Sequence, residues 1–509
     1  MVGAEYDFDV IVIGGGAGGA AFASACASAG KSVLIVERGP RTAGDPQPRG
    51  ERQTFVEKLP YDDRAIEVNE SPLRLFMGGV LGGGTSVYGA AMLRPSREDF
   101  TPGRHYGTLL DRSLWEWSVG YEELEPFYDE AEELFQLASN HEDDFGPLER
   151  PKCRNNSTLL PLAPINQRLI ARSREHGLRP FRLPLAIDTQ RCERCSACAG
   201  FLCPNGARRS AAAVIQEIVE RQRVHVMVNA EVEQLLLDCG GPRTARIEGG
   251  VRGVVIRDRR SQSSTTYRAP CYALAAGAIG SPAIALKSGL EGPQVGRNYM
   301  MHYSPLAAGV FAKPTGGDES FIKQVGFADF YFGTPDYRRK MGIVQSLPVP
   351  GPLMLRKTGM RRWPAGLVGS LRRRLLPLVG IVEDLPDPRN RVFLKESGAI
   401  ALAHQFSRFD RLRGAFLAKA MRRVLRRAGA VIRLTKQFPS QEHVAHQCGT
   451  LRMGADPRSG AVDADCRMFG APNLFVVDGS VLPTSLGVGP SLTIIANALR
   501  VARIACRDA

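Results

Sequence analysis

The sequence predicts a protein of the α/β class, with a parallel β-sheet assembled from separate stretches of chain. The first stretch, Asp9 to Glu37, holds an apolar strand, a glycine-rich turn, a helix of small residues and a second strand. Continuous apolar strands around such a turn are typical of a buried βαβ unit. Similar strands return at Val224–Asp238 and Tyr272–Ala276, and a strand, a loop and a helix follow from Asn473 to Ala505.

Length and composition indicate a globular protein of two or three domains. The chain has 509 residues, 44% of them hydrophobic, which allows a large core and excludes a disordered or fibrous protein. No apolar stretch reaches the roughly 20 residues that a membrane-spanning helix needs. The start, MVGAEYDFDV, lacks the basic residues, apolar stretch and cleavage site of a signal peptide, so we expect a cytoplasmic protein.

The first glycine turn indicates a dinucleotide site. Gly14, Gly16 and Gly19 fit the pattern G-x-G-x-x-G, whose glycines allow a tight turn, close approach of a pyrophosphate and close packing of helix on strand. The N-terminus of the following helix favours the negative charge. Glu37 follows eighteen residues after Gly19, where a carboxylate accepts hydrogen bonds from a ribose. An acid at this position argues against NADP and leaves NAD and FAD open.

Further stretches resemble the glucose-methanol-choline (GMC) oxidoreductase family, and they occur in the family's order. Gly82–Ala90 resembles the glycine turn under the flavin, and His446–Gly454 resembles the family's HPxGTCRMG block. The other similar stretches are Gly277–Pro282, Val295–Asn298 (VGRN) and Val476–Pro483 with the helix after it. The resemblance implies FAD, which takes a hydride at N5 from a CH–OH group. It also implies a sugar, aminosugar or related alcohol as the substrate, by analogy with family members that carry cysteines.

The domain organisation follows from the separated segments and from this resemblance. We expect a discontinuous Rossmann-type FAD-binding domain from residues 1–101, 205–297 and 441–509. Residues 102–204 form an insertion that contains a cysteine cluster. Residues 298–440 form a substrate-binding domain with an antiparallel sheet, as in the fold shared by GMC oxidoreductases and p-hydroxybenzoate hydroxylase.

The expected FAD contacts come from the matched stretches, with the acid Glu37 on the ribose. The full set comprises Gly14, Gly16, Gly19, Glu37, Gly83, Gly84, Thr85, Val232, Ala276, Gly277, Asp478, Gly479, Pro490 and Ser491. Some family members attach the flavin through a His in the second glycine turn. This chain has Thr85-Ser86-Val87-Tyr88 there, so we expect non-covalent FAD.

The resemblance assigns His446 as the base that removes the hydroxyl proton. A neutral imidazole is available at pH 7 because its reference pKa is near 6.5. The family usually has a second His or Asn before the Pro of the terminal block, but here Gly489 precedes Pro490. His302, His443 and the more distant Asn497 are candidate substitutes. The missing side chain leaves a non-oxidative reaction open, such as a lyase or a photodecarboxylase.

Four cysteines crowd into twelve residues, at Cys192, Cys195, Cys198 and Cys203, with Pro204 after the last. The C-x2-C-x2-C-x4-C-P spacing is one residue off a ferredoxin pattern. A [3Fe-4S] or [4Fe-4S] cluster, a zinc ion, and free or disulfide-linked thiols all remain open. A cluster passes electrons from the flavin to a redox protein, whereas O₂ is the simpler acceptor without one.

The formal charge of +14 is concentrated in the last third of the chain. Seven Lys and Arg fall between Arg356 and Arg374 and nine between Arg411 and Lys436, without an acid in either run. We interpret the first run as a lid or surface loop, with binding to a membrane surface as the lesser alternative. The charge lacks interleaved aromatic residues, so we expect no nucleic-acid partner. A further alternative is an electron-transfer subunit whose basic surface docks a redox partner.

Overall fold

The structure is a computed structural model that describes residues 6–42, 50–153, 159–195, 197–221, 223–238, 249–437 and 442–508. The first five residues, which bear on the expected lack of a signal peptide, lie outside these ranges. So does the predicted domain boundary at residues 440–441. None of the helices in the described ranges is long and apolar enough to cross a membrane.

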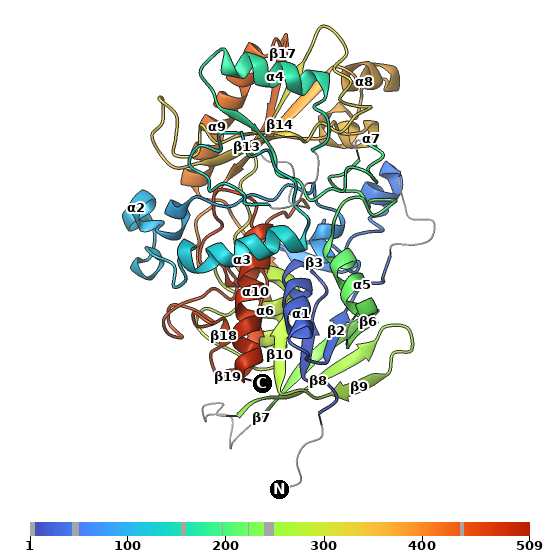
Figure 1. The fold of residues 1–509 in the computed structure, drawn as a ribbon, viewed down its shortest axis with the longest axis vertical. Helices are drawn as coiled ribbons and strands as arrows, with labels where there is room; N and C mark the ends of the chain where they lie inside the picture. The colour runs from blue at the N-terminus through green and yellow to red at the C-terminus, as the bar shows by residue number, and fades with distance from the viewer. Residues whose placement is uncertain are drawn as a thin grey trace.

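The predicted parallel sheet is present in the lower half of the molecule, and it contains six strands (Figure 1). Five strands pair in parallel, in the order β19-β10-β1-β2-β6, and β18 joins the edge antiparallel. The strands are β1 (Val10–Ile13), β2 (Val33–Glu37), β6 (Val224–Val228), β10 (Cys271–Leu274), β18 (Arg467–Met468) and β19 (Ala471–Val476). Three distant parts of the chain therefore form one sheet, and the predicted α/β class is confirmed.

Helix α1 packs between α10 and α5, in front of this sheet in Figure 1. α1 is made almost entirely of alanine, glycine and serine, which lets it approach its neighbours closely. Helix α3 packs on α10, and α6 follows β10. These helices are α1 (Ala17–Ser28), α3 (Tyr121–Leu134), α5 (Ala211–Arg221), α6 (Gly277–Lys287) and α10 (Ser491–Asp508).

A second six-stranded sheet, antiparallel throughout, forms the upper half of the molecule (Figure 1). Its strands, in spatial order, are β17 (Ile432–Lys436), β11 (Leu306–Val310), β14 (Leu375–Val382), β13 (Gly342–Ser346), β12 (Val325–Phe327) and β5 (Pro180–Arg182). The helices around it are α4 (Pro164–Arg174), α7 (Pro352–Leu355), α8 (Ala365–Arg372) and α9 (Arg408–Arg427), and α2 (Gly103–Tyr106) lies at the side. This is the antiparallel sheet expected for the substrate domain.

The fold also contains two smaller sheets. The three-stranded sheet contains β7 (Ala230–Asp238), β8 (Gly249–Asp258) and β9 (Ser264–Tyr267). The four-stranded sheet contains β3 (Ala65–Val68), β4 (Ser71–Arg74), β15 (Arg391–Leu394) and β16 (Ile400–Ala403). Because β3 pairs with β16 and β5 pairs with β12, strand pairing joins segments on both sides of the predicted domain limits. The limits themselves stay a prediction.

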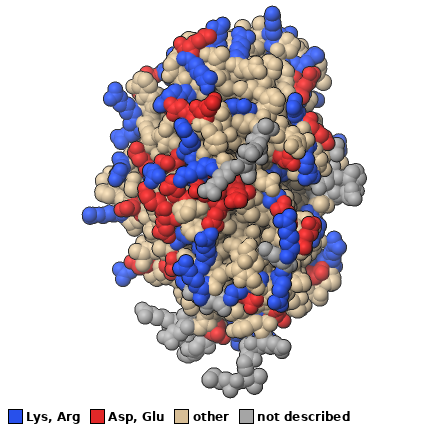
Figure 2. All heavy atoms as spheres, viewed as in Figure 1, with Lys and Arg blue, Asp and Glu red and all other residues tan. Residues whose placement is uncertain are grey.

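Surface charge is unevenly spread over the face seen in Figure 2. Acidic side chains gather across the middle of that face, over α3, and Lys and Arg side chains lie above and below them. α3 carries two acids in its first turn, Glu122 and Glu123, where they face the positive end of the helix dipole. The acidic band is therefore partly a helix-stabilising feature.

A cluster of buried charges lies where α2, β14 and α9 meet. The Lys340 ammonium forms ion pairs with Asp99 and with Glu383, the latter at 2.5 Å, and all three side chains are inaccessible to solvent. The Tyr106 hydroxyl donates to Glu383 at 2.6 Å, and the Arg413 guanidinium donates to the Tyr106 oxygen at 2.9 Å. Carboxylates without water need such partners, so these residues tie the 99–106 segment to the antiparallel sheet and α9.

We predict that Lys340→Met lowers the free energy of unfolding by about 3 to 5 kcal/mol, because it leaves two buried carboxylates without their cation. Urea unfolding measures the change. Lys395→Met is the matched control, since Lys395 is 45% exposed and pairs with Glu67 on the surface, where such a pair contributes about 1 kcal/mol or less. Equal losses of unfolding free energy in the two variants would contradict the stabilising role of the buried cluster.

Candidate active site

The turn after β1 has the geometry that its glycines predict. Gly14 has a φ of 111°, and a Cβ there would overlap the carbonyl of Ala275. A Cβ on Gly19 would overlap the carbonyl of Gly14, so α1 reaches the strand only because this residue is glycine. Gly16 differs, since a Cβ there would meet nothing nearer than 3.9 Å. Open space therefore lies beside Gly16 at the N-terminus of α1, where an anion is favoured.

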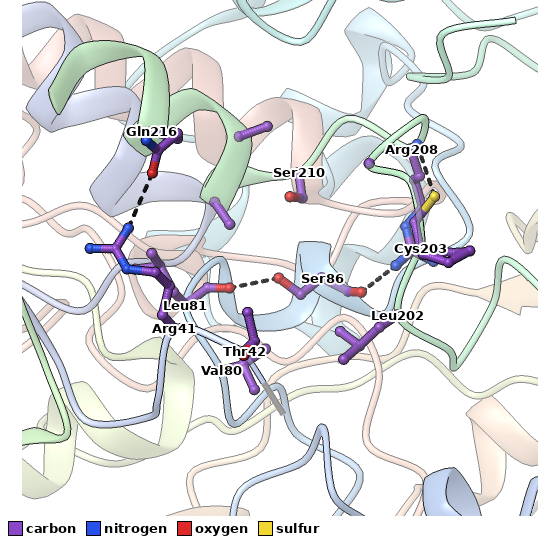
Figure 3. A pocket seen from close by; sticks show the side chains of 14 residues that line it. Arg41, Thr42, Val80, Leu81, Ser86, Leu202, Cys203, Arg208, Ser210 and Gln216 are labelled. Carbon is purple, nitrogen blue, oxygen red and sulfur yellow. Dashed lines mark hydrogen bonds between the residues drawn. The ribbon is translucent and has the colours of Figure 1, made fainter. Parts of the chain in front are cut away.

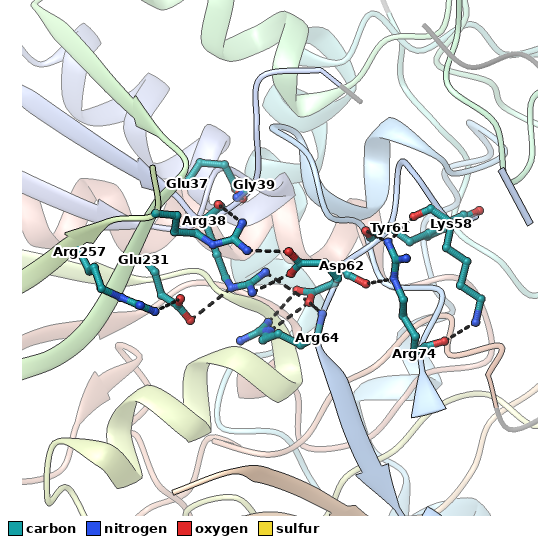
Figure 4. A network of polar contacts seen from close by, with 12 residues as sticks. Glu37, Arg38, Gly39, Lys58, Tyr61, Asp62, Arg64, Arg74, Glu231 and Arg257 are labelled. Carbon is teal, nitrogen blue, oxygen red and sulfur yellow. Dashed lines mark hydrogen bonds and ion pairs between the residues drawn. The ribbon is translucent and has the colours of Figure 1, made fainter. Parts of the chain in front are cut away.

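Glu37 ends β2 with its carboxylate turned back onto this turn. One oxygen accepts the Gly15 amide at 3.0 Å and the other accepts the Gly39 amide at 2.7 Å. Burial raises the pKa of Glu37, although both amides favour the charged form. The next residue, Arg38, pairs with Glu231 at 3.2 Å and with Asp62 at 3.4 Å, as Figure 4 shows. These contacts fix the position of the carboxylate that we expect on a ribose.

The second glycine turn closes over the first. Residues Gly83–Ser86 form a 3-10 turn, and a Cβ on Gly83 would lie 3.3 Å from Gly16 Cα. Gly84 faces open space, with nothing within 4 Å of a Cβ. Thr85 Oγ1 donates to the Gly82 carbonyl at 2.6 Å and accepts the Ala211 amide at 2.9 Å, which ties the turn to α5. Gly16 and Gly84 thus leave room beside the two turns, where we expect the FAD pyrophosphate.

Asp478 joins the middle and terminal segments of the parallel sheet. Its buried carboxylate accepts hydrogen bonds from the Gly277 amide at 2.8 Å and from the Ser281 hydroxyl at 2.5 Å. It also accepts the amide and the hydroxyl of Ser480, at 2.9 and 2.5 Å. Burial raises the pKa of Asp478 in spite of these donors. Asp478 thus acts on the backbone around the site, and a Cβ on Gly277 would meet nothing within 4 Å.

The remaining expected FAD residues lie around the same strand ends. Ala276 caps α6 and Gly479 follows Asp478, with the Gly479 carbonyl accepting the Gly449 amide at 3.1 Å. Pro490 and Ser491 are at the start of α10, and Val232 is buried in β7. The structure thus gives each expected residue a position, and their contacts with FAD stay a prediction.

His446 and His302 form a hydrogen-bonded pair. The two Nδ1 atoms lie 2.9 Å apart, and the rings meet edge to face with centroids 4.9 Å apart. His302 Nε2 lies 2.9 Å from the carbonyl oxygen of Leu486. His446 has a φ of 61°, an uncommon backbone conformation for a residue other than glycine and one that is typical of functional sites.

These contacts assign the proton positions. A carbonyl only accepts, so His302 Nε2 carries a hydrogen and donates it to Leu486. Burial lowers the pKa of His302 to about 4, so this ring is neutral and its Nδ1 is an acceptor. His446 Nδ1 must then donate. Burial and the neighbouring charge of Lys323 hold the pKa of His446 well below 6.5, which leaves its Nε2 unprotonated at pH 7.

The free nitrogen of His446 faces Gly489. A Cβ on Gly489 would lie 3.2 Å from His446 Nε2, and both residues keep some accessible surface. Even the first carbon of the His or Asn side chain that the family usually has here would be tightly packed against this ring. Of the candidate substitutes, the His443 ring packs on Phe76 at 4.7 Å, and the Asn497 amide contacts Cys466 Sγ and Arg500 at 3.3 and 3.1 Å. Of the three, His302 is the one that forms the hydrogen bond with His446 described above.

The loop that carries Leu486 is anchored on the second sheet. The Ile343 amide donates to the Gly487 carbonyl at 3.2 Å, and the Asp384 amide donates to Ser485 Oγ at 3.1 Å. A Cβ on Gly487 would overlap the ring of Tyr331, whose hydroxyl donates to Asp99 in the buried charge cluster at 2.5 Å. The charge cluster therefore supports the loop that orients the histidines.

The cysteine segment packs directly on the second glycine turn. The Gly200 amide donates to the Val87 carbonyl at 2.7 Å. The Arg208 guanidinium donates to the carbonyls of Tyr88, at 2.9 Å, and Phe201, at 2.8 Å, and also to those of Ser86 and Cys198. A cavity of about 290 Å³ lies beside this contact, lined among others by Cys203, Arg208 and Ser86 (Figure 3).

The four clustered thiols lie within electrostatic range of one another. Burial is the main cause that raises the pKa of Cys198 to about 12; Arg208 opposes it, and the neighbouring Cys195, Cys192 and Cys203 add to it. Cys195 is exposed, whereas Cys192 and Cys203 are half-buried. Within the described ranges, no three His, Cys, Asp or Glu side chains are arranged to hold a metal ion. The observed arrangement thus does not fit a cluster or a zinc ion.

Comparisons with known proteins decide the family. The family model described as GMC oxidoreductase matches residues 8–304 with its N-terminal part and residues 386–498 with its C-terminal part. The chain belongs to the GMC oxidoreductase family. The predicted enzyme class, an FAD-dependent oxidoreductase acting on CH–OH groups, is confirmed with it.

Two curated relatives similar to this GMC oxidoreductase are of comparable length. It is 29% identical to 6'''-hydroxyparomomycin C oxidase of Streptomyces lividus, over 98% of this chain and 91% of the relative. It is 27% identical to paromamine 6'-oxidase of Streptomyces fradiae, over 98% and 92%. The crystal structure of pyridoxine 4-oxidase from Mesorbium loti aligns with a TM-score of 0.65, over 97% of this chain and 98% of that one, at 18% identity. The last similarity shows the fold alone.

Sequence reasoning missed three features of this GMC oxidoreductase: the Leu486 carbonyl, the Arg208 contacts and the position of Lys323. Every residue has a backbone carbonyl, so the sequence does not indicate which carbonyl accepts a hydrogen bond from His302. Arg208 follows Cys203 closely in the sequence, and this proximity is the one signal that could have indicated the Arg208 contacts. Lys323 precedes a short apolar strand and matches no motif, so only the folded chain reveals its position.

We predict that kcat/KM for the alcohol does not fall as the pH is lowered from 8 to 6.5 and falls only well below pH 6.5. Low pH protonates His446 and so removes the base. Because the pKa of His446 is lowered, kcat/KM is lost only at lower pH. His302→Phe should lower kcat at least tenfold because His446 Nδ1 loses its acceptor, and His302→Asn, which keeps an acceptor, should restore part of it. Steady-state rates from pH 5 to pH 8 measure both effects.

His176→Ala is the matched control for the His302 variants, because His176 is exposed and bonds only to its own helix. It should leave the pH profile unchanged. A wild-type profile that falls with an apparent pKa near 6.5, or full activity in His302→Phe, would contradict the assigned histidine pair.

Proposed function

We propose that this enzyme oxidises the CH–OH group of a sugar or aminosugar to a carbonyl. The similarity over the whole chain to two oxidases whose names specify paromomycin-type aminoglycosides supports the substrate class. The observation that carries the chemistry is the unprotonated Nε2 of His446, which lies beside Gly489, and both residues keep some accessible surface.

In this proposal, His446 Nε2 accepts the hydroxyl proton of the alcohol. His302 orients the imidazole and keeps its proton on Nδ1, because its own Nε2 proton is bound by Leu486. The backbone around Gly16 and Gly84 holds the pyrophosphate, and Glu37 holds the ribose. When bound, FAD supplies the hydride acceptor. The flavin is held without a covalent bond, since the 85–88 segment carries no His.

The test is anaerobic bleaching of the flavin spectrum by aminosugars with a free primary hydroxyl, paromamine among them, compared with 6-deoxy analogues. We expect bleaching by the hydroxyl-bearing sugars alone. His446→Ala should keep FAD and bleach at least a hundredfold more slowly, because it lacks the base. Acid precipitation should leave the flavin in solution. Equal bleaching in His446→Ala would contradict the proposed mechanism, and bleaching by none of these sugars would contradict the substrate class.

The proposal also concerns the electron acceptor of the enzyme and the role of its clustered cysteines. The cysteine segment touches the glycine turn through Arg208, so it lies next to the expected flavin site. The observed thiol arrangement does not match a metal site, so O₂ is the acceptor that needs no further group. A redox protein, which would use an iron-sulfur cluster in this segment, is the alternative. A cytoplasmic location stays a prediction.

We predict that protein purified anaerobically contains flavin and less than 0.1 iron per chain, roughly the background of such an assay, since a cluster would need at least ~3 irons. Iron, zinc and acid-labile sulfide analysis measures this. Cys195→Ser should leave the visible spectrum unchanged. Stoichiometric iron with sulfide, lost in Cys195→Ser, would overturn the prediction and establish the cluster.

A further inference from the structure

Lys323 brings a positive charge to the second glycine turn. A Cβ on Gly89 would lie within 3.0 Å of three atoms of the Lys323 side chain, so the chain lies against the turn that we expect under the flavin. The Lys323 charge also reaches His446, whose pKa it helps to lower. Lys323 is therefore near both the turn expected under the flavin and the base.

The Lys323 ammonium is unpaired. Throughout the described part of the chain, no residue forms a hydrogen bond or an ion pair with it, although it lies close enough to Cys198 and Arg208 for their charges to act on it. Burial lowers its pKa to about 8, so most molecules carry the charge at pH 7. The side chain keeps some accessible surface, which a bound group can contact.

An unpaired ammonium in such a place lowers stability, because charge is lost from water without a compensating carboxylate. The other buried lysine described above, Lys340, has two carboxylates as partners. Arg208 is also close, but its guanidinium is engaged by backbone carbonyls. Lys323 thus has a charge that no carboxylate of the described residues compensates, which leaves it available to a group bound in the site.

We propose that the positive charge of Lys323 stabilises the negative charge that the flavin gains on reduction. This inference rests on the proposed function. The hydride carries two electrons from the carbinol carbon to the flavin ring, and the hydroxyl proton goes to His446. The ring therefore becomes one unit more negative, and a fixed cation beside it favours that state. The interaction is strong because the effective dielectric inside a protein is about 20 rather than 80.

The test is the reduction potential of bound FAD, measured by equilibration with reference dyes and without any alcohol. Lys323→Met should shift the equilibrium toward oxidised flavin at least tenfold, which is about 30 mV for a two-electron couple. Lys323→Arg keeps the charge and should stay within threefold of the wild type. Lys323→Met should melt no lower than the wild type, because it removes an unpaired buried charge.

Lys395→Met is the control for loss of a surface lysine, and its potential should equal that of the wild type. A Lys323→Met potential within threefold of the wild type, with FAD bound, would overturn the inference. So would an equal shift in Lys395→Met. These outcomes are separate from the proposed function, which fails if the wild type binds FAD but is not bleached by any of the sugar alcohols.

Discussion

The hydrogen bond from His302 to the Leu486 carbonyl is the interaction on which the chemistry of the site depends. The carbonyl can only accept, so it fixes the proton on His302 Nε2, which in turn fixes the proton on His446 Nδ1. If Leu486 turned away, His302 could donate from Nδ1. His446 would then accept at Nδ1 and carry its own proton on Nε2, which could no longer take a proton from the substrate. Leu486 is fully buried with a φ of 65°, so its carbonyl direction is set by the loop around it.

The support for this loop extends far from the histidines. Gly487 lies against Tyr331, and the Tyr331 hydroxyl is bound by Asp99, which pairs with Lys340. The buried charges thus serve both stability and alignment. They are compensated within the fold, whereas the charge of Lys323 is not, and this difference separates a structural lysine from one that faces a bound group. The same Lys323 charge helps to keep His446 neutral, so the base and the hydride acceptor share one electrostatic environment.

Local patterns predicted much of the fold. The parallel strands were visible as apolar runs, and Gly14, Gly16 and Gly19 marked the dinucleotide turn because each has a distinct steric role. The antiparallel sheet and the role of His446 came from family resemblance instead. The sequence could not predict that His302 binds His446, since 144 residues separate them and a lone His has no periodic signal. The charge cluster and Lys323 were missed for the same reason, as their contacts exist only after distant segments meet.

The central claim is that His446 is neutral with its proton on Nδ1. The most direct measurement is the nitrogen NMR spectrum of the FAD-bound protein labelled with ¹⁵N in histidine, with His446→Gln used to assign the signal among the eight histidines. The account predicts, at pH 7, a protonated Nδ1 and a bare Nε2 for His446. A proton on Nε2, or an imidazolium with protons on both nitrogens, would contradict it.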